Sequence, residues 1–141
     1  MTLVDHMYAD VLAFHDKLGI RPRMAVPTPL HRLPGGAGRE RVRHQSEETA
    51  ELTVAHAAGD LAAQADALVD IVYVAIGTAI MMGIDQGAWK EIWDAVQAAN
   101  ISKVPVDGGK QAAKPAGWRD PVEAIQEIIE RRRTAQLKEA A

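Results

Sequence analysis

A two-residue break near the middle of the chain constrains the fold more than any other feature. A helical pattern from about Arg39 to Ala58 ends at Gly59, a residue that commonly ends helices. Asp60 is then a good N-cap for a long helix from Leu61 to Met82, which Gly83 ends. A link this short favours an antiparallel helical hairpin. The sequence therefore predicts an all-α fold with a central antiparallel hairpin.

Further helices are expected on either side of the hairpin. One is predicted over Leu3 to Leu18, with Gly19 as its stop, and a shorter one follows Asp85. The last helix begins at Asp120-Pro121, an N-cap followed by the residue type best suited to the first helical position. Residues 20–38 and 100–119 are rich in Pro and Gly and are predicted to be loops. We expect a single domain over residues 1–141, a four-to-five-helix bundle.

Composition narrows the possible functions. The chain has 16 Lys and Arg against 19 Asp and Glu, so a general affinity for nucleic acid or anionic membranes is not expected. The chain contains no Cys, which excludes disulfides, thiolate metal sites and Cys nucleophiles. The longest uncharged apolar run, Ile71 to Ile84, is shorter than the roughly 20 residues of a membrane span and predicts a buried helix. Charged residues near the N-terminus argue against a secretory segment, and we expect a cytoplasmic protein.

The expected bundle is too small to cover its own apolar surface. A hairpin with a few short helices leaves much of the Ile71 to Ile84 region without a partner inside one chain. We therefore expect a homo-oligomer with isologous helix packing.

Carboxylates are concentrated on the two hairpin helices. Glu47 and Glu51 lie about 40° apart around their helix and Glu48 about 100° from Glu47, so the three share one sector. A solvated acidic face would explain these three residues alone. The second helix makes a solvated face a weaker explanation. It is the most apolar helix of the chain, and its only charged residues are Asp66 and Asp70, which lie one turn apart.

Antiparallel packing predicts that these five carboxylates converge without a basic partner on the second helix. Mg²⁺ or Mn²⁺ would relieve their repulsion, since both ions prefer oxygen ligands. Zn²⁺ is disfavoured because the five His residues lack ligand spacing, and a di-iron bundle would need Glu-x-x-His motifs that the sequence lacks. The residues therefore predict a divalent-cation site.

Several motifs resemble one enzyme superfamily. Glu47-Glu48-Thr49-Ala50-Glu51-Leu52 and Asp66-Ala67-Leu68-Val69-Asp70-Ile71-Val72-Tyr73 look like those of the all-α nucleoside triphosphate pyrophosphohydrolases, the MazG-like and phosphoribosyl-ATP pyrophosphohydrolase-like group. The resemblance runs from about Phe14 to Ile129 and is best to single-domain phage and bacterial members; it includes Gly77-Thr78-Ala79, Gly83-Ile84-Asp85, Asn100-Ile101-Ser102-Lys103-Val104, Asp107-Gly108-Gly109-Lys110, Lys114-Pro115 and Asp120-Pro121. It implies that Glu47, Glu48, Glu51 and Asp70 bind two or more catalytic metal ions. Ala67 stands where many relatives have Glu, and Asp66 is expected to substitute for it.

The resemblance also implies a reaction. A metal-activated water would attack the α-phosphorus of a nucleoside triphosphate, with Glu48 as the expected general base, releasing pyrophosphate. By resemblance, the leading substrate is dGTP or GTP, and the expected homo-oligomer is a dimer or tetramer. Two alternatives stay open: hydrolysis of phosphoribosyl-ATP, and a non-catalytic nucleotide-sensing or oligomerisation module.

Substrate contacts are expected from three regions. Phosphate contacts are expected from polar and basic side chains in or beside the second loop and from an arginine before the Glu cluster. The candidates are Asn100, Lys103, Lys110, Lys114 and Arg43, with Arg41 as the alternative to Arg43. Solvated side chains would give the same pattern. By resemblance, Phe14, His15 and the stretch through Pro29 are candidates for enclosing the base, and Tyr73 is a candidate for contacting the substrate. Trp89 and Trp93 are more typical of core or subunit packing.

Overall fold

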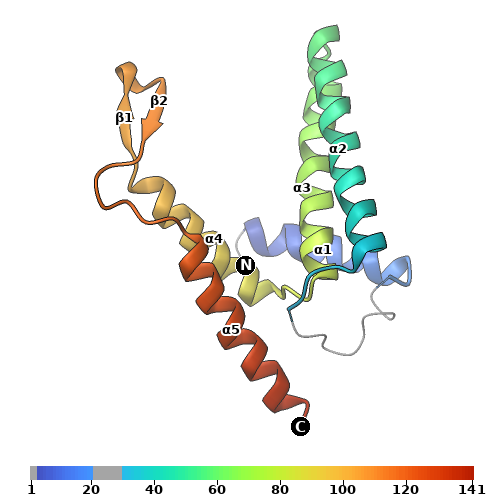
Figure 1. Ribbon diagram of the computed structural model, residues 1–141. Coiled ribbons are helices and arrows are strands. Elements are labelled where there is room, and N and C mark those ends of the chain that lie inside the picture. The colour runs from blue at the N-terminus through green and yellow to red at the C-terminus, as the bar shows by residue number, and fades with distance from the viewer. Residues whose placement is uncertain (1–2, 21–29) are drawn as a thin grey trace. The chain divides into compact units, whose positions relative to one another are not determined.

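The computed structural model describes residues 3–20 and 30–141, and within these ranges the chain is all-α with one small hairpin of strands (Figure 1). The helices are α1 (Leu3–Lys17), α2 (Gly35–Ala58), α3 (Leu61–Met81), α4 (Gln86–Ile101) and α5 (Val122–Glu139); the strands are β1 (Val104–Val106) and β2 (Gln111–Ala113). These elements confirm the predicted fold class. They form two compact units, Met1–Ile84 and Asp85–Ala141, which are described separately below.

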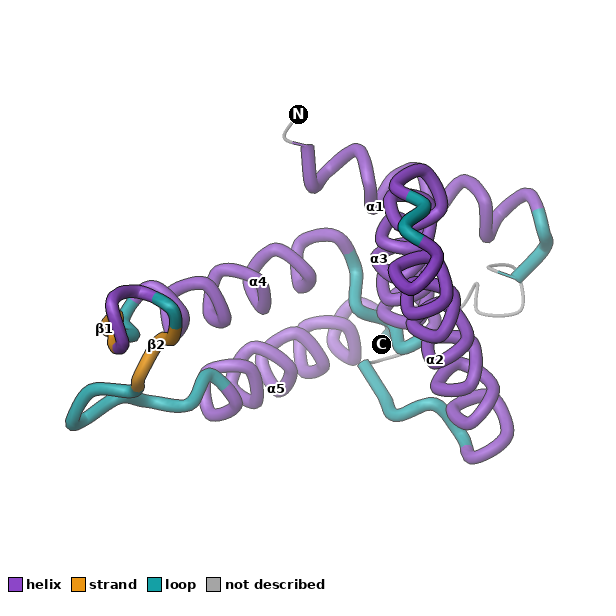
Figure 2. The backbone as a smooth tube through the Cα atoms, turned by 90° about the horizontal axis from the view of Figure 1, so that it is seen from above, coloured by secondary structure: helices purple, strands orange, loops and turns teal. Residues whose placement is uncertain are grey.

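The central hairpin forms as predicted. Helices α2 and α3 run side by side in opposite directions (Figures 1 and 2). Gly59 joins them with a left-handed backbone (φ 67°), a conformation that costs Gly little. The Asp60 carboxylate accepts a hydrogen bond from the Ala63 N–H at 3.0 Å and so caps α3.

The predicted loop over residues 20–38 is wrong at its end, because α2 begins at Gly35 and includes Gly36 and Gly38. Pro34 precedes the helix with extended backbone angles, and its carbonyl accepts the Gly38 N–H at 2.9 Å. Glycine lowers helix stability by about 1 kcal/mol per residue. A helix of 24 residues that packs along α3 tolerates this cost in its first turn. Residues 21–29 of the predicted loop lie outside the described residues.

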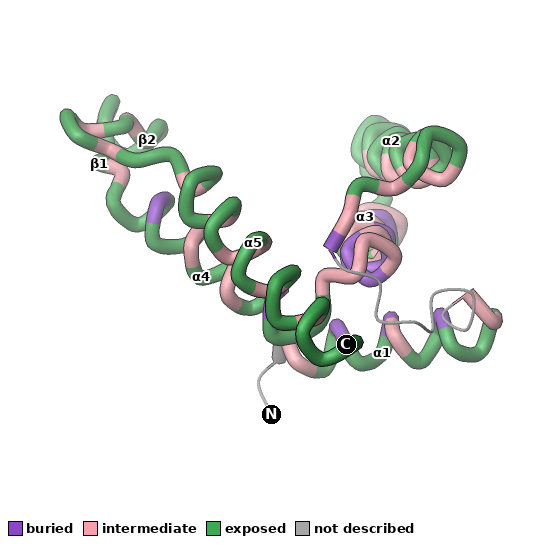
Figure 3. Tube along the Cα trace, turned by 60° about the horizontal axis from the view of Figure 1, so that its bottom comes forward, coloured by how far each residue is buried: buried purple, intermediate pink, exposed green. Residues whose placement is uncertain are grey.

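The core of the first unit lies between α1 and the C-terminal half of α3. Tyr8, Val11 and His15 form a buried stripe on α1, and Val74 and Ile80 are buried on α3. Figure 3 shows buried positions along both helices, whereas α2 is mostly exposed. The Tyr8 hydroxyl donates to the Ile84 carbonyl at 2.8 Å and ties α1 to the end of α3.

Part of the surface of α3 is exposed in its N-terminal half, although α2 packs along this helix and Ala67 is buried there. Leu61 and Leu68 are 80% and 53% exposed, and Val72 is 44% exposed. The rest of the predicted buried range Ile71 to Ile84 is buried or half-buried. With 21 residues and a mean hydropathy of 1.5, α3 meets the length and composition of a membrane span, the one such helix among the described residues. Core helices of soluble proteins meet the same test, so this composition does not decide the environment of α3.

The second unit pairs α4 with α5 (Figure 2). The Asp85 carboxylate accepts the Ala88 N–H at 2.8 Å and caps α4 as predicted. Before α5, Pro121 has helical backbone angles, and the Val122 N–H donates to the Asp120 carboxylate at 3.0 Å. The observed start of α5 therefore lies within one residue of the predicted start. The Glu91 carboxylate on α4 accepts hydrogen bonds from Arg131 and Arg132 on α5.

The predicted loop over residues 100–119 is wrong where β1 and β2 form. They pair antiparallel, with Val104 opposite Ala113 and Val106 opposite Gln111. The short 3₁₀ turn Asp107–Gly109 joins them, and positive φ values at Gly108 and Gly109 (63° and 85°) allow the chain to reverse tightly. The glycines that predicted a loop are therefore the turn of a hairpin.

Candidate functional site

The three Glu residues of α2 differ in exposure. The side chain of Glu48 is only 13% exposed, whereas that of Glu47 is 49% exposed and forms an ion pair with Arg43 at 2.5 Å. The His44 Nε2 lies 3.5 Å from Glu48 Oε1, one turn earlier on the same helix. Glu48 is thus the shielded carboxylate of the group, while Glu47 is held at the helix surface.

Carboxylates from both hairpin helices act on Glu48. The pKa of Glu48 is raised, first by burial and then by the negative charges of Glu51, Asp70 and Glu47, while His44 acts in the opposite direction. Asp70 is half-buried on α3, so the hairpin brings at least one α3 carboxylate into the electrostatic field of the α2 cluster. No described Lys or Arg lies within ion-pairing distance of Glu48, Glu51 or Asp70.

The fifth predicted carboxylate differs from the others. Asp66 is exposed, and it is not among the groups that shift the pKa of Glu48. Asp66 therefore differs from the half-buried Asp70, although the two lie one turn apart on α3. In residues 3–20 and 30–141, no three Asp, Glu or His side chains are close enough together to hold a metal ion as they stand.

The donor chemistry of the cluster nevertheless fits a hard divalent cation. All of the candidate ligands are carboxylate oxygens, the type that Mg²⁺ and Mn²⁺ prefer. Burial raises the pKa of Glu48 first, and the repulsion from the neighbouring carboxylates, which raises it further, is what a cation would remove. The ligand assignment to Glu47, Glu48, Glu51, Asp66 and Asp70 stays a prediction.

A pocket of about 540 Å³ opens beside the start of this cluster, a size typical of small-molecule sites. Its lining combines apolar and charged side chains: Leu18, Gly19, Ile20, Glu40, Arg41, Arg43, His44, Glu47 and Met81. Arg41 and Arg43, which the sequence offered as alternatives, both line it. His44 connects the pocket to the cluster: its Nδ1 lies 3.5 Å from Arg41 Nη1, and its Nε2 lies 3.5 Å from Glu48 Oε1.

The candidates for enclosing the base lie where α1 meets α3. The rings of Phe14 and Tyr73 meet edge to face with centroids 5.7 Å apart. Burial and the nearby Asp10 carboxylate raise the pKa of Tyr73. His15 is 4% exposed, and a Cβ built on Gly77 would lie 2.8 Å from its Nε2. The rest of the predicted stretch through Pro29 includes residues 21–29, outside the described residues.

The second unit brings together three of the predicted phosphate-contacting residues around an indole. The Lys114 and Lys103 ammonium groups lie 4.3 and 5.7 Å from the centroid of Trp118, and Lys103 donates to the Asn100 side chain at 2.8 Å. Lys110 is exposed at the hairpin turn. Sequence reasoning missed Trp118, although an aromatic residue four positions after Lys114 was a signal for such a contact.

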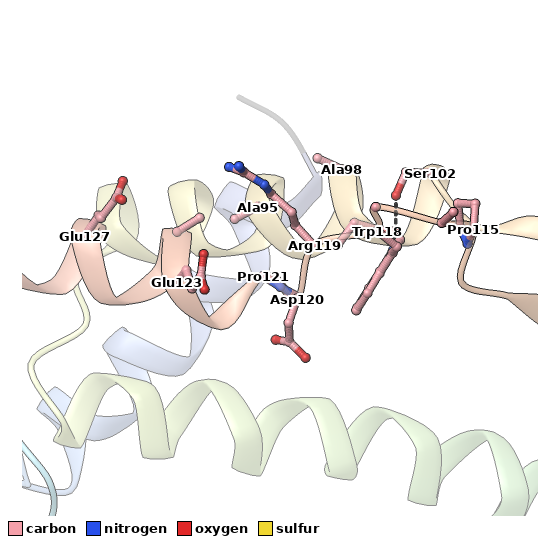
Figure 4. A pocket seen from close by; sticks show the side chains of 14 residues that line it. Ala95, Ala98, Ser102, Pro115, Trp118, Arg119, Asp120, Pro121, Glu123 and Glu127 are labelled. Carbon is pink, nitrogen blue, oxygen red and sulfur yellow. Dashed lines mark hydrogen bonds between the residues drawn. The ribbon is translucent and has the colours of Figure 1, made fainter.

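Trp118 also lines the second unit's own pocket, of about 510 Å³ (Figure 4). Its indole N–H donates to the Ala99 carbonyl at 2.8 Å, which fixes the ring against α4. Glu123 and Glu127 of α5 line the other end of this pocket. Their negative charges make that end unsuited to a phosphate chain.

The fold and the clustered carboxylates thus define an all-α protein with an acidic helical hairpin. The sequence matches the family model described as phosphoribosyl-ATP pyrophosphohydrolase over residues 13–100, a range that contains all five predicted ligands, and the chain belongs to this family. The match confirms the predicted superfamily and identifies a pyrophosphohydrolase, a hydrolase of acid anhydrides. No curated protein and no solved structure gives a match.

Proposed function

We propose that the protein is a Mg²⁺- or Mn²⁺-dependent nucleoside triphosphate pyrophosphohydrolase, which converts a (deoxy)nucleoside triphosphate and water to the monophosphate and pyrophosphate. The family match supports the reaction class. The site is supported best by one observation: the shielded Glu48 carboxylate lies in the electrostatic field of three other carboxylates and has no Lys or Arg partner among the described residues.

The proposed metal ligands are Glu47, Glu48, Glu51 and Asp70, with Asp66 as a further or water-mediated ligand. Bound there, two or more divalent ions would neutralise phosphate charge and lower the pKa of a water molecule. The side chains have to turn toward one another for this, and the Glu47 carboxylate has to leave Arg43. Both movements involve exposed or half-buried side chains on rigid helices.

Glu48 is the proposed general base. Its raised pKa makes it a better proton acceptor near neutral pH than an ordinary glutamate. It would take a proton from the attacking water while the water oxygen bonds to the α-phosphorus. The bond from the α-phosphorus to the bridging oxygen breaks, and pyrophosphate leaves with the electron pair of that bond.

The proposed substrate is dGTP or GTP, on the resemblance to phage and bacterial relatives. Phosphoribosyl-ATP is the alternative that the family description favours, because it offers the same phosphoanhydride bond. A non-catalytic sensing module is a second alternative, and the observation that favours it is Ala67 at a position where many relatives have a Glu.

We also propose a homo-oligomer in the cytoplasm, held by the exposed part of α3. Leu61, Ala65, Leu68 and Val72 follow a 4-3-4 spacing, which places them in one stripe, and all four are exposed. A second copy of the same stripe would cover it with isologous packing. Light scattering of the native protein and of Leu68→Glu tests this, with a shift toward monomer expected for the variant.

Product analysis tests the proposed reaction. The protein is incubated with Mn²⁺ and with each canonical nucleotide or phosphoribosyl-ATP, and monophosphate, diphosphate, pyrophosphate and orthophosphate are separated. Equal amounts of monophosphate and pyrophosphate from dGTP or GTP support the proposal. Turnover of phosphoribosyl-ATP alone would favour the first alternative, and metal binding without any turnover would favour the second.

A further inference from the structure

The two arginines that line the first unit's pocket have different environments. Arg43 is exposed, and its charge is compensated by the ion pair with Glu47. Arg41, two positions earlier, is half-buried and contacts α3. The sequence alone could not separate these two residues, but the packing of the hairpin does.

Arg41 has hydrogen-bond partners but no partner of opposite charge. Its Nε donates to the Thr78 hydroxyl at 3.0 Å and its Nη2 to the Val74 carbonyl at 2.9 Å. No Asp or Glu among residues 3–20 and 30–141 lies within ion-pairing distance of it, and the remaining residues contain no acid. Its positive charge is therefore uncompensated at short range.

The neighbours of Arg41 do not supply the missing charge. A Cβ built on Gly77 would lie 2.8 Å from His15 Nε2 and 3.1 Å from Arg41 Nη2, so His15 and Arg41 converge over Gly77. Burial and the charge of Arg41 both lower the pKa of His15, which favours its neutral form. Glu40 interacts with Arg41 only at longer range, as the neighbouring residue on an exposed part of α2.

An uncompensated guanidinium in a concave site is a ready partner for phosphate, because its planar donors match phosphate oxygens. The rest of the pocket suits a nucleotide, with apolar side chains from Leu18, Ile20 and Met81 and the acidic cluster starting at its rim with Glu47. We propose that Arg41 is the anchoring residue for the substrate's phosphate chain in this pocket. The inference deepens the proposed function by placing the anion beside the site proposed for the cations.

Calorimetric titration of the intact protein with inorganic tripolyphosphate in EDTA tests the anchor without turnover or metal. Arg41→Gln is expected to weaken binding by about 10- to 100-fold, the loss of one charge-assisted interaction. Arg41→Lys keeps the charge and is expected to retain more affinity than Arg41→Gln. Arg39→Gln, which removes the same charge outside the pocket lining, is expected to bind as the native protein does.

Thr78→Val separates anchoring from a structural role of Arg41, because it removes the Arg41–Thr78 hydrogen bond and leaves the charge in place. Native-like tripolyphosphate binding by Thr78→Val supports the anchor, and an equal loss in Thr78→Val and Arg41→Gln would overturn it. If Arg41→Gln does not fold, Arg41→Lys is the deciding variant. A tripolyphosphate affinity below that of the native protein but still measurable supports the anchor. The anchor would be overturned if Arg41→Lys and Arg39→Gln both bind tripolyphosphate with native affinity and that affinity does not change with salt concentration.

The same titration keeps this inference distinct from the proposed reaction. Tripolyphosphate binding that depends on Arg41 in a protein without turnover would sustain the anchor and reject the hydrolase. Turnover with an unchanged KM in Arg41→Gln would sustain the hydrolase and reject the anchor. Comparing tripolyphosphate with dGTP then shows how much affinity the nucleoside adds.

Discussion

Two glutamates, one in each unit, have opposite electrostatic environments. Glu91 on α4 accepts hydrogen bonds from Arg131 and Arg132, and these contacts lower its pKa. Glu48 on α2 is shielded from solvent and lies in the electrostatic field of three other carboxylates, and burial and these charges raise its pKa. Glu91 is thus matched by cations of its own unit. On the α2–α3 hairpin, in contrast, Glu48 and Glu51 have no Lys or Arg partner among the described residues, and Arg41 has no Asp or Glu partner. In the proposed complex, the metal ions of a metal-bound nucleotide would compensate the carboxylates, and its phosphates would compensate Arg41.

Of the substitutions that test the difference between Glu48 and Glu91, the largest expected effect is on catalysis. Glu48→Gln removes the proposed general base and one proposed metal ligand, so kcat for nucleotide hydrolysis should fall by about 100-fold or more. Glu91→Gln is the matched control in the other unit and should keep the native kcat. An equal loss in both variants, measured by pyrophosphate release, would mean that the hairpin has no special role.

Packing against the hairpin predicts the next largest effect. Gly77→Ala places a Cβ 2.8 Å from Nε2 of the buried His15, and overpacking of this kind typically costs about 1–3 kcal/mol. Gly36→Ala in α2 meets nothing within 4 Å and should be neutral or stabilising by up to about 1 kcal/mol. Urea unfolding of both variants checks the pair, and equal stabilities would contradict the close approach of α1 and α3.

The buried His15 predicts a pH dependence. Its pKa is lowered from 6.5 by burial and by Arg41, with Asp16 acting the other way. The unfolded chain therefore binds the proton first as pH falls, so stability is complete above pH 6.5 and decreases toward the lower native pKa. The slope for one group is at most about 1.4 kcal/mol per pH unit.

The difference between native protein and His15→Gln isolates this slope from Glu48, whose raised pKa acts in the opposite direction. Urea midpoints at pH 7.5 and 5.5 measure it. The native protein should lose more stability on acidification than His15→Gln does, and parallel changes in the two proteins would show that His15 does not titrate as proposed.

The smallest expected effect is on stability without metal. Glu48→Gln removes repulsion within the acidic cluster and should raise the free energy of unfolding by about 0.5 kcal/mol in EDTA, the scale of like-charge pairs on a helix. Glu91→Gln should change stability in the other direction, because it weakens the contacts with Arg131 and Arg132. Thermal unfolding in EDTA at low salt compares the two, and a shared sign would remove the contrast.

Local signals made the helix boundaries predictable. Gly59, Asp60 and Asp85 act through their own backbone and the next few residues, so the sequence contains all the information needed for these caps. The start of α2 at Gly35 was missed because packing along α3 outweighs the low helix propensity of glycine. The β1–β2 hairpin was missed because three-residue strands give almost no periodic pattern.

The candidate site was only partly predictable, because orientation depends on packing. Two positions separate Arg41 from Arg43, about 200° around the helix, and only the position of α3 decides which of them turns inward. Asp66 and Asp70 share one face of α3, and only their positions along the hairpin separate them: Asp70 acts on Glu48 and Asp66 does not. Which two helices carry the clustered carboxylates could be predicted from the sequence, because this needs only helical periodicity and the positions of the charged residues.

Mn²⁺ binding tests the central claim most directly, namely that the unmatched carboxylates of the hairpin form a cation site. Isothermal titration with MnCl₂, supported by the Mn²⁺-induced shift in Tm, compares the native protein with Glu48→Gln and Glu91→Gln. We predict saturable binding and a raised Tm for the native protein and Glu91→Gln, with both lost or much weakened in Glu48→Gln. Equal Mn²⁺ binding by all three proteins, or none by the native protein, would contradict the account.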